Sequence, residues 1–107
     1  MNNLNSILLE GSLAADPKCV DGVCSFLLSS VRELKNRPAE ITTVKVSVPQ
    51  QLAEACTTLG RKDSGVRVVG RIAQERKAFV IVAEHIEFRP IQASANSAIL
   101  TKGRTKA

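Results

Sequence analysis

The 107-residue chain is poor in aromatic side chains: it has no tryptophan, no tyrosine and only three phenylalanines, Phe26, Phe79 and Phe88. It lacks any apolar run near the ~18 residues of a membrane-spanning helix, and its opening residues lack the basic and apolar segments of a secretory signal. The three cysteines are an odd number, which argues against a secreted disulfide framework. We therefore expect a cytoplasmic protein that has no membrane partner.

Acidic residues are missing from the C-terminal part of the chain. The formal net charge is +5, yet residues 1–88 hold eleven basic side chains against ten acidic ones, and the other four basic residues follow from Arg89 onward. A positive charge favours an anionic partner such as nucleic acid. The sequence predicts one domain over residues 1–88 and a basic, disordered tail over 89–107. That tail is either an arm that follows nucleic acid or an end that keeps the protein soluble.

Nothing in the sequence predicts an enzyme or a cofactor. His85 is the single histidine and has no nucleophile near it in the chain, and the glycines match no phosphate-binding loop. A Cys3His zinc set could be drawn from Cys19, Cys24, Cys56 and His85. Only one of its pairs is close in sequence, and Cys56 fits the apolar face of a helix, so we expect no metal.

The alternation of apolar and polar residues is clearest over residues 41–48. It separates an apolar set, Val44, Val46 and Val48, from a polar set, Thr43, Lys45 and Ser47. Period-2 alternation predicts a strand with one face buried. Further strands are predicted over 5–13, where Gly11 suggests a bulge or a tight bend, and over 25–31, 65–74 and 78–88. A short helix is predicted over 50–59, with Gly60 as its C-terminal cap.

Asp21-Gly22 predicts a two-residue hairpin turn, because both positions of that turn need positive φ. The turn places Val20 opposite Val23 and Cys19 opposite Cys24. A non-hydrogen-bonded antiparallel pair has its Cα atoms about 4.5 Å apart, which permits a disulfide, although a cytosolic chain normally keeps such a pair reduced. We hypothesise a redox-sensitive hairpin.

The order of three strands, a helix and two strands predicts an all-β fold with one short helix: the five-stranded Greek-key barrel of the oligonucleotide/oligosaccharide-binding (OB) fold. Four segments add a resemblance to the bacterial single-stranded DNA-binding protein family. They are NLNSILLEGSL at 3–13 with Asp16-Pro17, QLAE at 51–54, GVRVVGRI at 65–72 and VAEHIEF at 82–88. The resemblance implies sequence-independent single-stranded DNA binding in replication, repair or recombination, near the nucleoid. It also implies a homo-oligomer, a tetramer or a dimer through the first strand.

The chain departs from that family where the family stacks DNA bases on aromatic rings. At those positions this sequence has Val31-Arg32, Thr43, Pro49 and Lys77, and its hairpin after residue 74 is shorter than is usual. Stacking contributes about 1–3 kcal/mol per base, so we expect weak, mainly electrostatic binding. The chain ends in KGRTKA rather than in the family's acidic, phenylalanine-ended tail, so we expect it not to recruit the usual partner proteins.

The predicted DNA-binding set combines the basic residues of the expected groove with one residue on its central strand and one aromatic side chain. It consists of Arg32, Lys35, Thr43, Lys45, Arg61, Lys62, Arg67, Arg71, Arg76, Lys77 and Phe79. For Phe79 a core or interface position is favoured over a stacking role, and Phe26 and Phe88 are predicted to lie in the core.

An OB-fold protein-interaction module that has lost DNA binding is the alternative. Such a module would act through oligomerisation, through a primosome-like partner, or by mixing with a standard family member. The missing aromatics favour this alternative, whereas the basic stretch 61–77 favours DNA binding.

Overall fold

The protein was analysed as a computed structural model that describes residues 2–90. The predicted tail over 89–107 lies outside these residues except for Arg89 and Pro90. Along the chain the elements are β1 (Ile7–Leu13), β2 (Lys18–Val20), β3 (Val23–Arg32), β4 (Glu40–Val48), the 3-10 turn η1 (Gln50–Leu52), α1 (Ala53–Leu59), β5 (Gly65–Glu75) and β6 (Ala78–Arg89). Neither helical segment in this part of the chain is long and apolar enough to cross a membrane.

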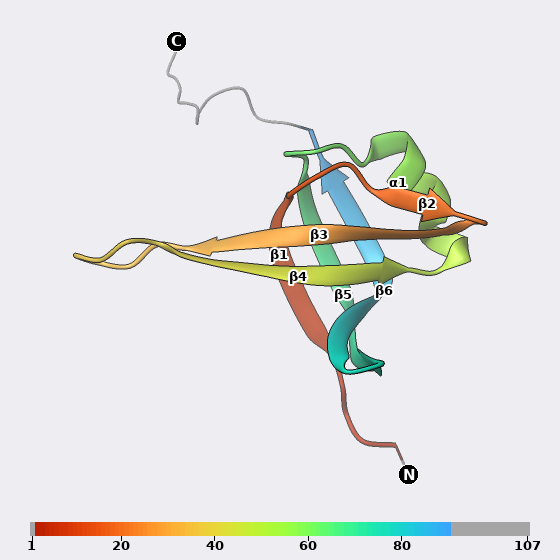
Figure 1. The fold of residues 1–107 in the computed structure, drawn as a ribbon, viewed down its shortest axis with the longest axis horizontal. Helices are drawn as coiled ribbons and strands as arrows, with labels where there is room; N and C mark the ends of the chain where they lie inside the picture. Colours follow the sequence, from red (N-terminus) through yellow and green to blue (C-terminus); the bar gives the residue numbers. More distant parts are fainter. Residues whose placement is uncertain (1, 91–107) are drawn as a thin grey trace.

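Five of the strands close into a barrel. Their order is β1-β5-β6-β4-β3, and β1 pairs back onto β3 through Ser12↔Ser29 and Leu13↔Leu28. All pairings are antiparallel except that of β4 with β6, which starts at Val46↔Ile81. Figure 1 shows β3 and β4 crossing in front of β1, β5 and β6. This closed five-stranded mixed barrel with one short helix confirms the predicted fold class.

Gly11 lies where β1 bends from β5 toward β3. A Cβ atom at this position would stand 2.3 Å from the Ser29 carbonyl oxygen, closer than any side chain permits. Glycine is needed here because the backbones of β1 and β3 approach each other closely where the barrel closes.

The core fills the barrel with alternate residues of each strand. Leu13, Leu28, Val46 and Val68 have no exposed surface. Truncating a fully buried leucine such as Leu28 to alanine costs about 2–5 kcal/mol. Phe26 is buried, and its ring centroid lies 6.1 Å from that of the partly buried Phe88, so the predicted core positions of both rings are confirmed.

The helical segment covers one end of the barrel through Ala53 and Cys56, which are both buried in the core cluster. The predicted helix over 50–59 is confirmed, and Pro49 precedes it. Gly60 does follow its end, but its φ is −76°, so it is not the left-handed cap that the sequence suggested. Glycine is needed there because a Cβ atom would lie 2.7 Å from the Cys56 carbonyl oxygen and 2.8 Å from Cγ of Pro17.

The β2–β3 hairpin has the predicted register, with Cys19↔Cys24 and Val20↔Val23 as pairs. Asp21 and Gly22 form its turn with φ values of 52° and 78°, as a two-residue turn of this type requires. At the other end, β3 and β4 stay paired as far as Arg32↔Glu40 and project beyond the barrel as a two-stranded arm (Figure 1).

Candidate nucleic-acid interface

The outward side of β3 and β4 forms a continuous surface, which we call the β3–β4 face. Its side chains alternate with the core residues Phe26, Leu28, Val46 and Val48, and so they point away from the barrel. Cross-strand pairs along it join Ser25 to Ser47, Leu27 to Lys45, Ser29 to Thr43, and Val31 to Ile41. The predicted placement of Thr43 and Lys45 on one strand face is confirmed.

A hollow of about 290 Å³ lies between this face and the loop that follows β1. It is lined by Ser25, Phe26 and Leu27 of β3, by Lys45 of β4, and by Ala15, Asp16 and Lys18 of the loop and β2. Lys18 therefore adds a second positive charge to the hollow, and the sequence reasoning missed it. The predicted hairpin register could have found it, because Lys18 pairs with Ser25, a residue of the outward set.

The β5–β6 hairpin borders the β3–β4 face on the other side. Its Glu75 reaches Lys45, with 3.2 Å between Oε1 and Nζ. The two-residue turn Arg76-Lys77 follows directly, and Arg76 has a φ of 58°. Arg76 and Lys77, two more of the predicted basic residues, thus lie at the edge of the face. Lys45 already forms an ion pair with Glu75.

The arm carries Arg32 at the end of β3 and Lys35 in the connecting loop, and both are exposed. Its outward surface is apolar beside them, since Val31 is 59% exposed and the opposite Ile41 is 67% exposed. Val31 lies at one of the positions where the family resemblance implies an aromatic ring and this chain has none.

Arg67 and Arg71 lie elsewhere, on the outward side of the three-stranded layer that we call the β1–β5–β6 face. Arg67 donates to Oε2 of Glu10 from Nε at 3.1 Å and from Nη2 at 2.9 Å, and Arg89 donates to the same oxygen at 3.3 Å. The hydrogen bond from Arg67, reinforced by its charge, lowers the pKa of Glu10 below the ordinary value of 4.5. Arg71 stands 3.9 Å from Glu84.

Arg61 and Lys62 are placed in a third region, between α1 and the loop after β1. Arg61 lines a second hollow of about 310 Å³ together with Asp16, Cys19, Cys56 and Thr57. The backbone N–H of Lys62 donates to Oδ1 of Asp16 at 2.7 Å and so fixes the loop. The loop after β1 separates this hollow from the one that contains Lys45, because Asp16 lines both.

Phe79 is 69% exposed on β6, next to the Arg76-Lys77 turn. The expectation of a core position is therefore wrong for this residue. Its cross-strand partner Gln74 is also exposed, so this end of the hairpin extends past the barrel and no other element of residues 2–90 covers the ring. A stacking platform and an interface contact are the two roles that an exposed ring can fill.

The cysteines are arranged in a pair and a single thiol. Cys19 and Cys24 are joined by a disulfide with Cα atoms 4.0 Å apart, as the predicted pairing allowed. Cys56 is free and buried, and burial raises the pKa of its thiol. Over residues 2–90 no three His, Cys, Asp or Glu side chains gather as metal ligands, and His85 is exposed on β6.

Comparison with known structures places this geometry among solved folds. A structure of Plasmodium falciparum SSB in complex with ssDNA matches with a TM-score of 0.67 and 19% sequence identity, covering 82% of this chain and 96% of that chain. The chain has the OB fold. Neither protein-family models nor curated protein sequences match this OB-fold chain, so the likeness is one of fold.

Proposed function

We propose that this OB-fold protein binds single-stranded DNA without sequence preference and without catalysis, in DNA replication, repair or recombination. The observation that carries the proposal is the β3–β4 face. It corresponds to the surface of strands two and three where OB folds bind oligonucleotides, and the loop after β1 and the β5–β6 turn border it as they do in such folds. The matched Plasmodium falciparum SSB structure, which has this fold, is a complex with single-stranded DNA.

The contacts we infer are mainly with phosphates. Lys45 presents its ammonium group on the face itself, and Lys18, Arg76 and Lys77 lie along its borders. Each phosphate neutralised on a single strand adds about 0.7 to the slope of log affinity against log salt, so four contacts predict a slope near −3. Leu27 and Phe79 supply the apolar surface within the same path.

The remaining predicted residues extend this path or lie apart from it. Arg32 and Lys35 would extend the DNA path along the arm. Arg61 and Lys62 would contact the DNA on the far side of the loop after β1. Arg67 and Arg71 already have carboxylate partners on the β1–β5–β6 face, so we expect them to contribute least.

A homo-oligomer through β1 is part of the proposal, together with a cytoplasmic location near the nucleoid. Among residues 2–90, β1 pairs with β3 through its last two residues alone, so the preceding residues have no strand beside them on that side. Leu8 on this strand is 63% exposed. Free edges and exposed apolar side chains are the features through which strands of two copies pair.

Fluorescence anisotropy of a labelled oligothymidine across a salt series tests the DNA-binding proposal. We expect binding at low salt that weakens steeply as salt rises, because counterion release dominates. A duplex of the same length should bind more weakly. Absence of binding to the single strand at low salt would overturn the proposal.

One observation favours the alternative of an OB interaction module that has lost DNA binding. Lys45, Arg67 and Arg71 each stand within 4 Å of a carboxylate, so part of the basic surface is already neutralised. A nuclease-treated pull-down separates the two proposals. A stoichiometric protein partner, such as a standard family member or a primosome-like protein, would be retained only by an interaction module.

A further inference from the structure

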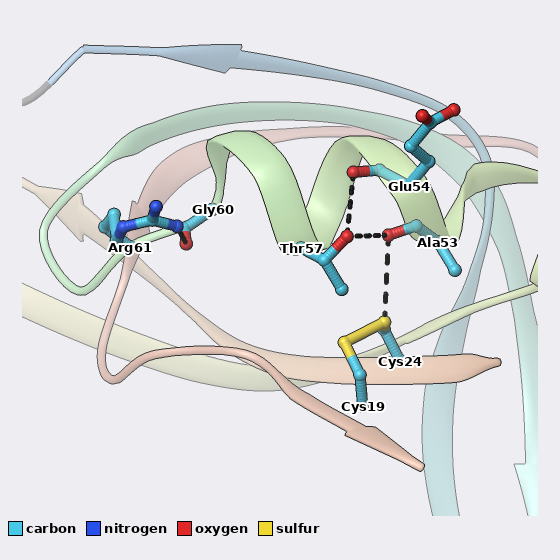
Figure 2. Close-up of a disulfide and its surroundings, with 7 residues drawn as sticks. All are labelled: Cys19, Cys24, Ala53, Glu54, Thr57, Gly60 and Arg61. Carbon is cyan, nitrogen blue, oxygen red and sulfur yellow. Dashed lines mark hydrogen bonds between the residues drawn. A yellow bond between two sulfur atoms is a disulfide. The ribbon is translucent and has the colours of Figure 1, made fainter. Parts of the chain in front are cut away.

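The Cys19–Cys24 disulfide lies beside the candidate DNA interface. It links Cys19, in the three-residue strand β2, to Cys24 in β3. All three residues of β2 are exposed. Cys24 is almost fully buried, whereas Cys19 is exposed. Figure 2 shows the disulfide directly against α1, where Cys24 Sγ lies 3.9 Å from the Ala53 carbonyl oxygen.

The segment from Ala14 to Val20 is anchored at its two ends in different ways. At its start, the Ala14 N–H donates to the Leu27 carbonyl oxygen at 2.9 Å, and Asp16 accepts from the Lys62 N–H at 2.7 Å. At its end, it is held by three β2–β3 residue pairs and by the disulfide. A three-residue strand alone is a weak attachment, so the disulfide is the strongest link between this end of the segment and β3.

We propose that this disulfide is a redox switch for DNA binding: the oxidised hairpin holds Lys18 against the β3–β4 face, and reduction releases it. The inference rests on the proposed function, because Lys18 lines the hollow that we assign to DNA. The disulfide closes a loop of only five residue steps. A short loop contributes less chain entropy than a long one, so we expect the effect of reduction to be largest within the hairpin itself.

The switching step needs a dithiol reductant. One of its thiolates attacks Sγ of the exposed Cys19, the Cys19–Cys24 bond breaks, and Cys24 leaves as a thiolate that takes up a proton. The second thiol of the reductant then attacks the mixed disulfide, which frees the Cys19 thiol and oxidises the reductant. In the reduced state the buried Cys24 S–H can donate to the Ala53 carbonyl oxygen, which a disulfide sulfur cannot do.

Anisotropy of labelled oligothymidine, measured before and after dithiothreitol treatment, tests the switch. Loss of one ordered lysine contact should weaken binding roughly threefold to tenfold. Cys56→Ala keeps the disulfide and should respond like the native protein. The double variant Cys19→Ser/Cys24→Ala should bind like the reduced protein and should not respond to dithiothreitol.

Amide hydrogen exchange supplies a readout that is independent of DNA. Reduction should accelerate exchange over residues 18–24, while the anchored amides of Ala14 and Lys62 stay protected. Unchanged exchange in the hairpin, or equal DNA affinity of the two redox forms, would overturn the switch. If neither form binds oligothymidine, the proposed function fails, and the switch fails with it even where the hairpin opens.

Discussion

Basic side chains lie on the β1–β5–β6 face and also on and around the β3–β4 face, but the two groups differ in what surrounds them. On the β1–β5–β6 face Arg67 and Arg89 converge on Glu10, and Arg71 stands near Glu84. On the β3–β4 side Lys45 forms an ion pair with Glu75. Lys18 and the Arg76-Lys77 turn lie at the borders of that face and have no ion-pair partner among residues 2–90. Charge available to a ligand therefore depends on the acidic partners that the fold supplies.

The largest expected effect comes from removing positive charge from the β3–β4 side, with removal of the same charge from the β1–β5–β6 face as the control. Lys18, Lys45 and Lys77, all changed to alanine, should lower affinity for oligothymidine by roughly a hundredfold at low salt and flatten the salt slope by about two units. The matched control removes the same charge from the other face by changing Arg67, Arg71 and Arg89 to alanine, and it should change affinity less than threefold. Equal losses in the two variants would contradict the comparison.

Phe79 gives the next largest effect. If the exposed ring stacks on a base, Phe79→Ala should weaken binding by about tenfold, within the range of 1–3 kcal/mol per stacked base. Phe79→Leu keeps apolar surface without an aromatic face and should recover little of the loss. Unchanged DNA affinity with an altered mass in solution would instead assign the ring to an interface between copies.

Glu75→Gln is expected to raise the affinity for DNA. This change frees Lys45 and removes a negative charge from the border of the β3–β4 face, so affinity should rise about threefold at low salt. Glu84→Gln makes the same change beside Arg71 on the other face and should have no effect. A rise with both variants would show that only net charge matters.

The smallest effect concerns the pH dependence of stability. The pKa of Glu10 is lowered in the folded state, so its ion pairs stabilise the fold above the unfolded pKa near 4.5, and this contribution is lost as pH falls through the lowered value. Thermal melts at pH 7 and pH 3 should therefore differ less for Glu10→Gln than for the native protein. An identical pH dependence in both proteins would show that the pairs contribute nothing.

The sequence predicted the elements that local signals determine. Alternation along 41–48, the Asp21-Gly22 turn and the helix before Gly60 all appear where expected, because each depends on residues that are neighbours in the chain. The five-stranded OB barrel was also predicted, since only a few topologies accommodate this succession of elements.

Much of the candidate site depends on contacts between distant residues. Glu10 and Arg67 are 57 residues apart, and Lys45 and Glu75 are 30 apart. These pairs follow from the β1–β5 register and from the path of the β5–β6 hairpin, which no local pattern encodes. The core position considered for Phe79 was wrong for a related reason: alternation alone could not show that the hairpin runs beyond the barrel core.

Mapping amide chemical shifts on addition of oligothymidine tests the central claim most directly. The account predicts the largest changes over Lys18, Leu27, Lys45 and residues 75–79, and little change at Glu10 and Arg67. Shifts centred on the β1–β5–β6 face, or no shifts at low salt, would contradict it.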